Sequence, residues 1–373
     1  MSNPIRVLHV IGIMNRGGAE AMIMNLYRNI DKSKVQFDFV ENSFEPAAFD
    51  EEIEALGGKI YRCPHFNGKN YLQYRKWWND FFREHKNEYR IIHGHIGSCA
   101  AIYLHEAKKA GLYAIAHSHS SGTDHSMESY LYSIVSYPTR YIADYFFACS
   151  RVAGEDRYGK KVAKSQKCKV LNNAVNTNDF KFDQCIRESV RSKFAFDNKF
   201  VIGHIGRFVG VKNHAFIIDI FSEVKIRIPN AILLLVGDGP LKGEIEQKVN
   251  TMGLQDSVIF TGVRSDVNQL IQSMDIFVFP SLFEGLPVTL VETQTAGLPC
   301  IISDKVPTES IITDELVTVM KLSDSPKTWA EHIIKRLNER RFDRSQEVID
   351  AGYDIVSTAK WLEEFYLEKS RGD

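Results

Sequence analysis

Two glutamates in the carboxyl-terminal third have the spacing to hold a polar ligand. Glu284 lies in the run Phe283-Glu284-Gly285-Leu286-Pro287, and Glu292 follows with seven residues between the two carboxylates. Gly285 and Pro287 mark a loop-to-helix junction, since proline is tolerated in the first helical turn. A rise of 1.5 Å per residue places Glu292 about 7.5 Å beyond Pro287. The two carboxylates could be an acid and a base, or could bind opposite ends of one ligand, and the helix N-terminus between them suits an anion.

A pair of cations follows the predicted strand at residues 200–205. The run from Gly206 to Lys212 puts Arg207 and Lys212 at the carboxyl end of this strand, which is where open α/β sheets bind ligands. Arginine offers a bidentate fork and lysine a point charge, so the pair suits a diphosphate; solvated surface charges are the alternative. Two later strand ends could bring Gly239 and Arg264 to the same edge, Arg264 with backbone groups for a base.

A glycine pair follows the first strand of the chain. This strand leads through Gly12 and Asn15 into Gly17-Gly18 and a helix that reaches about Asn29. Glycines at such a junction let backbone amides approach a phosphate at the helix N-terminus; a tight turn with no ligand is the alternative. The spacing is not G-x-G-x-x-G, which disfavours a nicotinamide dehydrogenase.

Histidines cluster at the ends of two other strands predicted in the first half, as His93, His95, His117 and His119. Such clusters can signal a metal, but ligand sets normally bring a spacing or a carboxylate partner that is not recognisable here. No two aspartates stand two residues apart, so a D-x-D metal site is absent from the sequence. We therefore expect no metal, and expect His119 to face a substrate, with His117 and His95 as secondary candidates beside Asn15.

Parallel sheets must position these residues. Strand-like runs alternate with amphipathic segments, which is typical of β-α-β units and a parallel sheet. The pattern predicts two doubly wound α/β domains facing across a cleft, an amino-terminal one at 1–175 and a carboxyl-terminal one at 176–355, with a polar candidate hinge at 175–198. The last helix, at 356–368, is amphipathic and is expected to pack back on a domain surface. The predicted strands are 5–13, 35–40, 90–93, 112–117, 145–150, 200–205, 231–236, 257–260, 275–279 and 299–303.

Composition limits the class of protein. The chain has 373 residues, is 44% hydrophobic, and has a formal net charge of -1, which argues against general nucleic-acid binding. Scattered cysteines and the lack of a signal-peptide h-region indicate a cytoplasmic protein. Residues 69–90 carry aromatic side chains at helical spacing with basic residues between them. This segment could touch a membrane at its inner face or could be an ordinary helix that covers the sheet.

Taken in order, the Gly17-Gly18 loop, the Gly206-Arg207…Lys212 turn, the Gly237-Asp238-Gly239-Pro240 turn and the glutamate pair resemble glycosyltransferase family four. The resemblance covers essentially the whole chain and implies a GT-B fold of two Rossmann-like domains, with the last helix (356–373) returning to the first, acceptor-side domain. One departure is Asn173-Ala174, where the family often has Asn-Gly. Within the family the chain looks most like bacterial enzymes of capsular and exopolysaccharide assembly.

The resemblance also implies a role for each matching residue. Glu284 would contact the donor sugar, Glu292 the ribose, Arg207 and Lys212 the diphosphate, and His119 the region of the anomeric carbon. The remaining donor-site residues would be Gly17, Gly18, Gly206, Gly239, Arg264, Gly285 and Leu286.

The expected reaction is metal-independent transfer of a hexose from a nucleotide sugar, with UDP as the expected nucleotide, to a sugar or lipid-linked saccharide acceptor, with retention. No cofactor is expected. A UDP-sugar 2-epimerase of the same architecture and a non-catalytic nucleotide-sugar-binding subunit are the alternatives.

Overall fold

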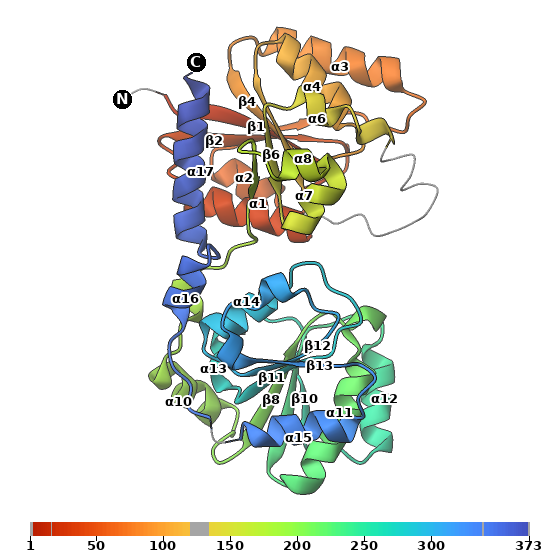
Figure 1. Ribbon diagram of the computed structural model, residues 1–373, viewed down its shortest axis with the longest axis vertical. Coiled ribbons are helices and arrows are strands. Elements are labelled where there is room, and N and C mark those ends of the chain that lie inside the picture. The colour runs from red at the N-terminus through yellow and green to blue at the C-terminus, as the bar shows by residue number, and fades with distance from the viewer. Residues whose placement is uncertain (1–2, 16, 120–133, 338, 372–373) are drawn as a thin grey trace. The chain divides into compact units, whose positions relative to one another are not determined.

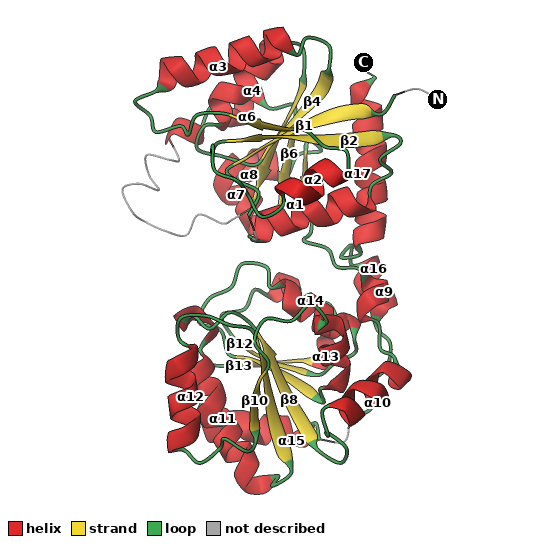
Figure 2. Ribbon diagram, turned by 180° about the vertical axis from the view of Figure 1, so that it is seen from behind, coloured by secondary structure: helices red, strands yellow, loops and turns green. Residues whose placement is uncertain are grey.

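The chain folds into two compact units, which are Met1–Ala174 with Ile355–Asp373, and Val175–Asp354. The computed structural model describes residues 3–15, 17–119, 134–337 and 339–371 (Figure 1). Each unit is built on a parallel sheet with helices on both faces, as Figure 2 shows. The expected fold class of two doubly wound α/β domains is therefore confirmed. The unit borders lie one residue before the expected domain borders.

The first unit holds a sheet in the order β3-β2-β1-β4-β5-β6-β7, and every paired strand in it is parallel. Five of its strands match predicted ones, while β3 and β7 were missed because each has three residues that are at most partly buried. Such runs carry no recognisable hydrophobic period. The strands are β1 (Ile5–Ile11), β2 (Val35–Glu41), β3 (Ile60–Arg62), β4 (Tyr89–Gly94), β5 (Tyr113–Ser118), β6 (Tyr145–Ala148) and β7 (Cys168–Val170).

Helices cover both faces of this sheet and bury separate apolar clusters. One cluster lies under α1 and α17, and the other under α3 and α4. The last helix, α17, packs against α1, β1, β2 and β4, so the expected return of the chain to the first unit is confirmed. The helices are α1 (Gly18–Asn29), α2 (Asp50–Ala55), α3 (Tyr71–Glu84), α4 (Ala100–Lys109), α6 (Thr139–Ile142), α7 (Arg151–Tyr158), α8 (Lys160–Ala163) and α17 (Ile355–Ser370).

The second unit holds a parallel sheet in the order β10-β9-β8-β11-β12-β13. All six residues of β9 are buried, as expected for a central parallel strand covered on both faces. The edge strand β13 was not predicted, since most of it is partly or fully exposed. The strands are β8 (Phe200–Ile205), β9 (Ala231–Val236), β10 (Val258–Phe260), β11 (Ile276–Phe279), β12 (Cys300–Ser303) and β13 (Val317–Met320).

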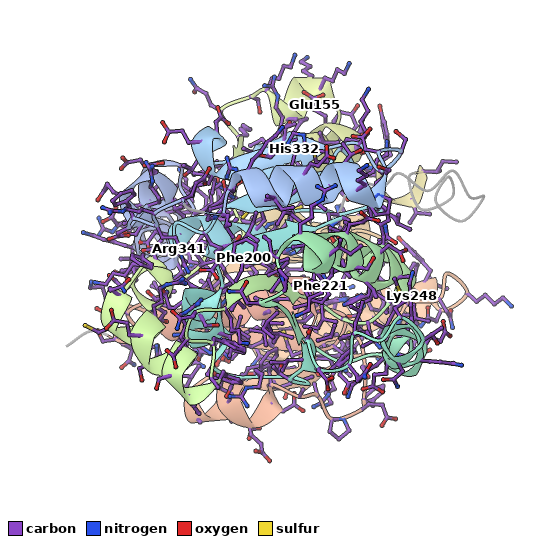
Figure 3. All side chains as sticks on the ribbon, turned by 90° about the horizontal axis from the view of Figure 1, so that it is seen from below. Glu155, Phe200, Phe221, Lys248, His332 and Arg341 are labelled. Atoms are coloured by element: carbon purple, nitrogen blue, oxygen red, sulfur yellow. The ribbon has the colours of Figure 1, made fainter. Side chains whose placement is uncertain are left out.

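The core of the second unit also has two sides. Phe200 and Phe221, labelled in Figure 3, belong to the cluster under α11, α12 and α15, and α10, α13 and α14 cover the opposite face. The helices are α9 (Thr177–Phe180), α10 (Gln184–Lys193), α11 (His214–Arg227), α12 (Lys242–Thr251), α13 (Val267–Ser273), α14 (Val288–Thr295), α15 (Pro326–Lys335) and α16 (Ser345–Asp350), with short 3-10 turns at η1 (Gly210–Lys212), η2 (Thr308–Ser310) and η3 (Asp314–Leu316).

Most of the candidate hinge at 175–198 is packed structure. It contains α9 and α10, and Arg187 and Arg191 of α10 both form ion pairs with Asp275, next to β11. Family members often have glycine at the position of Ala174, but the backbone of Ala174 does not have a positive φ. Alanine therefore meets no backbone strain at this position.

The aromatic side chains of 69–90 mostly face inward. Tyr74, Trp78, Phe81 and Phe82 of α3 are buried in the cluster that α3 and α4 cover, so Trp78 cannot be a membrane contact. The amphipathic pattern comes from packing on the sheet. Among the described residues, no helix combines the length and apolar character needed to cross a bilayer.

Candidate functional site

The order of the second sheet reverses between β8 and β11, since the chain winds outward from β8 to β10 and then from β11 to β13. The loops that follow these two neighbouring strands leave the same end of the sheet on opposite sides. This topological switch point is where doubly wound folds bind ligands. The loops are residues 206–213 after β8 and residues 280–287 after β11, and they carry the predicted donor-site residues.

Backbone and side-chain hydrogen bonds join these two loops. The Leu282 amide donates to the Val211 carbonyl at 2.8 Å, and Asn213 Nδ2 donates to the Pro280 carbonyl at 3.2 Å. Asn213 adopts a left-handed conformation (φ 56°), which turns the chain into α11. The loops are therefore held with their side chains close to each other.

Lys212 and Glu284, which lie far apart in the sequence, form an ion pair at this junction. Lys212 Nζ lies 2.7 Å from Glu284 Oε1, and the side chains are 19% and 12% exposed. The ammonium also lies 4.7 Å from the centre of the Phe279 ring. Pairing at this depth is stronger than at an open surface because water screens it less. Two of the predicted residues are thus brought into direct contact.

Arg207 is the second cation of this loop. Its side chain is exposed, and within the described ranges the structure gives it no hydrogen bond or ion pair. A guanidinium has five donors in a fixed fork. Arg207 is therefore free to bind an anion beside Lys212.

Glycines let the neighbouring turn approach the cationic loop. Gly237 has φ +136°, and a Cβ built on it would lie 2.1 Å from the Gly206 carbonyl oxygen; at Gly239 a Cβ would lie 2.6 Å from the Phe208 carbonyl oxygen. The Phe208 amide donates to the Asp238 carbonyl at 3.0 Å across this contact. Gly237 and Gly239 therefore pack the turn against the loop that carries Arg207. A Cβ at Gly285, in contrast, would meet no atom within 4 Å.

Arg264 lies at the same edge, on the loop after β10. Its guanidinium forms an ion pair with Asp266 at 2.7 Å. The Gly262 carbonyl on the same loop accepts from the Gly237 amide at 2.9 Å. The Arg264 side chain is thus engaged with its own loop, and the expected contact to a base rests on backbone groups.

Glu292 lies in the second turn of α14, which begins at Val288 after the capping Pro287 and ends before Gly297 in a left-handed conformation (φ 57°). The residue is partly exposed, and its carboxylate has no hydrogen bond or ion pair in the part of the chain that the structure describes. Burial raises the pKa of Glu292 to about 7. Leu286, ahead of the helix, packs on a small apolar cluster that includes Val291.

The glycine pair of the first unit begins α1. Gly17 is the capping residue and offers no side-chain cap, and a Cβ at Gly18 would meet no atom within 4 Å. Asn15 is exposed, and its Oδ1 accepts from the Ala48 amide at 3.0 Å. The Glu20 carboxylate lies directly against Gly17. The first amides of α1 are thus open at Gly18, with an acid beside them.

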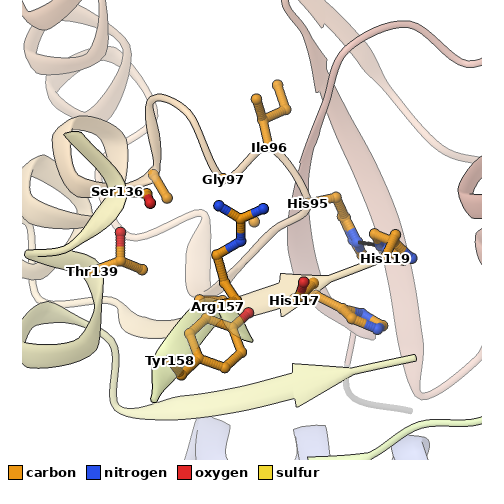
Figure 4. A pocket seen from close by; sticks show the side chains of 13 residues that line it. His95, Ile96, Gly97, His117, His119, Ser136, Thr139, Arg157 and Tyr158 are labelled. Atoms are coloured by element: carbon orange, nitrogen blue, oxygen red, sulfur yellow. Dashed lines mark hydrogen bonds between the residues drawn. The ribbon is translucent and has the colours of Figure 1, made fainter. Parts of the chain in front are cut away.

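The histidines at the ends of β4 and β5 join a larger hydrogen-bond network, of which Figure 4 shows His95, His117 and His119. His95 Nδ1 lies 2.7 Å from His119 Nε2, and His95 Nε2 lies 3.0 Å from His9 Nδ1. His93 links His117, at 3.2 Å, to the Tyr366 hydroxyl, at 2.6 Å. The candidates His95, His117 and His119 are therefore brought together.

Burial disfavours the charged form of these imidazoles. Burial lowers the pKa of His119 to about 4 and that of His9 to about 3. Burial and the neighbouring rings lower the pKa of His93, His95 and His117 well below the usual range. His119 can donate or accept a hydrogen bond near neutral pH, but does not carry a positive charge.

Sequence reasoning missed His9 and Tyr366. His9 lies inside β1, and Tyr366 lies on the last helix, far from the other histidines in the chain. The signal that could have found His9 is the alternation of side chains along β1, which points His9 and Ile11 to the same face of the sheet.

Comparison with known proteins identifies the relatives of this chain. The family model "Glycosyltransferase Family 4" matches residues 16–179, and "Glycosyl transferases group 1" matches residues 186–354. The putative glycosyltransferase EpsF of Bacillus subtilis (strain 168) is 36% identical over 95% of this chain and 94% of its own length. The capsular polysaccharide biosynthesis glycosyltransferase CapH of Staphylococcus aureus is 22% identical over 98% and 99%.

Solved structures share the fold. Anabaena Alr3699/HepE in complex with UDP superposes with a TM-score of 0.77 at 17% identity, covering 98% of this chain and 100% of that one. A glycosyltransferase from Rickettsia africae superposes with a TM-score of 0.78 at 16% identity, and both chains are covered completely.

Proposed function

Because this chain belongs to glycosyltransferase family 4, with a carboxyl-terminal half of the group 1 glycosyl transferases, we propose that it moves a hexose from UDP to an acceptor hydroxyl with retention at the anomeric carbon. The observation that carries the proposal is the Lys212–Glu284 pair at the β8/β11 switch point. Beside it stands Arg207, whose side chain has no hydrogen bond or ion pair within the described part of the chain. Cations at this position can hold a diphosphate, and a carboxylate next to them can hold sugar hydroxyls.

Each residue of the site has a separate role in binding the donor or in stabilising the transition state. Arg207 and Lys212 bind the diphosphate and stabilise the charge that grows on it as the glycosidic bond breaks. Glu284 accepts hydrogen bonds from the donor sugar, and Glu292 accepts them from the ribose. His119 lies near the anomeric carbon, and the amides at Gly17-Gly18 meet the phosphates.

The proposed reaction is a front-face attack. The acceptor hydroxyl attacks the anomeric carbon from the side of the departing diphosphate, which takes the acceptor proton. Exclusion of water protects the activated sugar from hydrolysis. No metal takes part in the transfer, so the activity should persist in an excess of EDTA.

Two similar proteins support a UDP-sugar as the donor and polysaccharide biosynthesis as the pathway. The structural neighbour HepE has been crystallised with UDP and with UDP-glucose, and CapH is a glycosyltransferase of capsular polysaccharide biosynthesis. We propose a UDP-sugar as donor, a sugar or lipid-linked saccharide as acceptor, and assembly of a cell-surface polysaccharide in the cytoplasm as the setting.

A donor screen followed by product analysis tests the function. Thermal shift against UDP-, GDP- and ADP-sugars should give the largest stabilisation with a UDP-sugar. Incubation with that donor and saccharide acceptors should then give an α-linked product from an α-linked donor, read by NMR. Inversion would overturn retention. Conversion of the donor alone into its C2 epimer would identify an epimerase, and binding without turnover a binding subunit.

The raised pKa of Glu292 predicts that this carboxylate lowers the stability of the protein at high pH, while it contributes to UDP binding. A carboxyl whose pKa rises from 4.5 to about 7 on folding stabilises the fold fully below about pH 4.5 and loses that contribution as the pH rises through 7. The melting temperature of Glu292→Gln should therefore exceed that of the wild type more at pH 8 than at pH 5. Its affinity for UDP should fall about 10-fold or more, since hydrogen bonds to a charged group contribute about 1.5–3 kcal/mol.

Calorimetry at the two pH values and titration with UDP measure these effects. Glu244→Gln, at an exposed position of α12, is the control and should change neither quantity. A Glu292→Gln protein with the wild-type pH dependence would contradict the pKa, and unchanged UDP affinity would contradict the ribose assignment.

We propose that the exposed start of α3, within residues 69–90, makes a peripheral contact with the membrane. Tyr71 and Leu72 at the start of α3 are 44% and 77% exposed, and Lys69 and Lys76 nearby are also exposed. Leu72→Asp should lower co-sedimentation with anionic vesicles. Ile226→Asp, at a 74% exposed position of α11, is the control. Equal binding by wild type and Leu72→Asp would remove the proposal.

A further inference from the structure

Three histidines of the first unit have the arrangement of a metal-binding site. His95 follows β4, His117 lies within β5 and His119 follows β5. One ring nitrogen from each lies within 4.8 Å of those of the other two. We propose that His95, His117 and His119 bind one divalent transition metal ion of the zinc type.

The donor set selects the class of ion. Three neutral imidazoles without a carboxylate or a thiolate suit Zn²⁺, Co²⁺, Ni²⁺ or Cu²⁺, whereas Mg²⁺ and Ca²⁺ prefer oxygen ligands. Three protein ligands leave a fourth tetrahedral position open, as in catalytic zinc sites.

His117 offers the clearest free donor. The residue is 4% exposed, and its Nε2 is buried with no hydrogen-bond partner among the residues that the structure describes. An unpaired buried nitrogen costs free energy, which coordination of a metal would offset.

His117 and His95 each have a hydrogen-bond partner at the ring nitrogen that would not bind the metal. His117 Nδ1 meets His93 Nε2, and His93 Nδ1 meets the Tyr366 hydroxyl. His95 Nε2 meets His9 Nδ1, which leaves His95 Nδ1 for the metal in place of its present contact with His119. Metal-binding histidines normally use their second nitrogen in this way, because it fixes the ring and the tautomer.

A cavity borders these three histidines. It has a volume of about 90 Å³ and is lined by His95, His117 and His119, with Arg157 and Ser118 also at its wall (Figure 4). His9 and His93, which form a second cluster with His95, do not line it. The cluster of His95, His117 and His119 is therefore favoured over the cluster of His9, His93 and His95, because only its three residues all line the cavity.

The site goes beyond the proposed transfer reaction, which needs no metal. Because the proposed transfer proceeds without a metal, a bound ion would hold the rings of these three histidines in place and would take no part in the reaction. The metal site itself is tested by binding, so its outcome does not depend on any transferase assay.

Metal titration of the untagged, chelator-treated full-length chain tests the site. Calorimetry with Zn²⁺ should give one ion per chain, and Co²⁺ should develop the visible absorption of a tetrahedral complex. His95→Ala and His119→Ala should each bind at least about 100-fold more weakly, since loss of even a partner behind a ligand costs 10–100-fold. Both residues are partly exposed, so we expect both variants to fold.

His105→Ala, at an exposed position of α4, is the matched control and should bind as the wild type does. Circular dichroism checks the fold of each variant. Failure of the wild type to bind Zn²⁺ and Co²⁺, or wild-type affinity in both His95→Ala and His119→Ala, would overturn the proposal. If a variant is unfolded, the Co²⁺ spectrum of the wild type decides, because three imidazoles and water give a tetrahedral signature that scattered surface histidines do not.

Discussion

Replacing Lys212 with alanine is expected to lower kcat for sugar transfer by about 10²–10³-fold, the loss typical when one preorganised group that stabilises transition-state charge is removed. Glu284→Ala should cause a comparable loss, because the donor sugar is then no longer oriented over the diphosphate. Steady-state kinetics with the donor found in the screen measures both effects.

Stability measurements separate this role from a structural one. Each single variant leaves a partner charge at a largely buried position (19% and 12% exposed), which is destabilising. The double variant Lys212→Ala/Glu284→Ala removes both charges, so it should regain part of the melting temperature and none of the activity. Recovery of activity in the double variant, or near-full activity in either single variant, would contradict the site.

A surface ion pair of the same unit provides the control. Lys242 and Glu246 lie 3.7 Å apart on α12, and their side chains are 32% and 45% exposed. Lys242→Ala should leave kcat and the melting temperature close to wild type, because exposed pairs contribute about 0–1 kcal/mol.

Gly237→Ala is expected to destabilise the second unit and to disable the donor site together. The new Cβ would lie 2.1 Å from the Gly206 carbonyl oxygen, at φ +136°. Backbone strain of about 1–3 kcal/mol and overpacking of about 1–3 kcal/mol add to roughly 3 kcal/mol or more. The backbone must move to relieve the contact, which displaces Arg207 and should lower kcat/KM by about 100-fold.

Denaturant unfolding and kinetics of Gly237→Ala test this coupling. Gly243→Ala is the matched control, because a Cβ there meets no atom within 4 Å, and alanine is up to about 1 kcal/mol more favourable than glycine in a helix. Wild-type stability and activity in Gly237→Ala would show that the two loops do not depend on this close approach.

The sequence predicted the elements that have strong local patterns. Buried runs such as β8 and β9 have nearly continuous apolar residues, and the glycine and proline junctions around them mark their ends. The strands β3, β7 and β13 were not predicted, because edge strands of three or four residues are partly exposed and show no hydrophobic periodicity. Their positions follow from pairing with a neighbour, which a local pattern does not encode.

The sequence by itself determined the two α/β units, the family and the residue types of the site, because these depend on periodicity and on short motifs. Only the tertiary structure decided which side chains meet. Lys212 reaches Glu284, and His117 reaches Tyr366 through His93, because parallel strands bring their carboxyl ends to one edge and α17 folds back on the first sheet. Burial was also decided by the tertiary structure. The helix α3 turns Trp78 inward, and α14 leaves Glu292 without a hydrogen-bond or ion-pair partner among the described residues. These surroundings alter protonation and accessibility, and the local sequence pattern does not encode them.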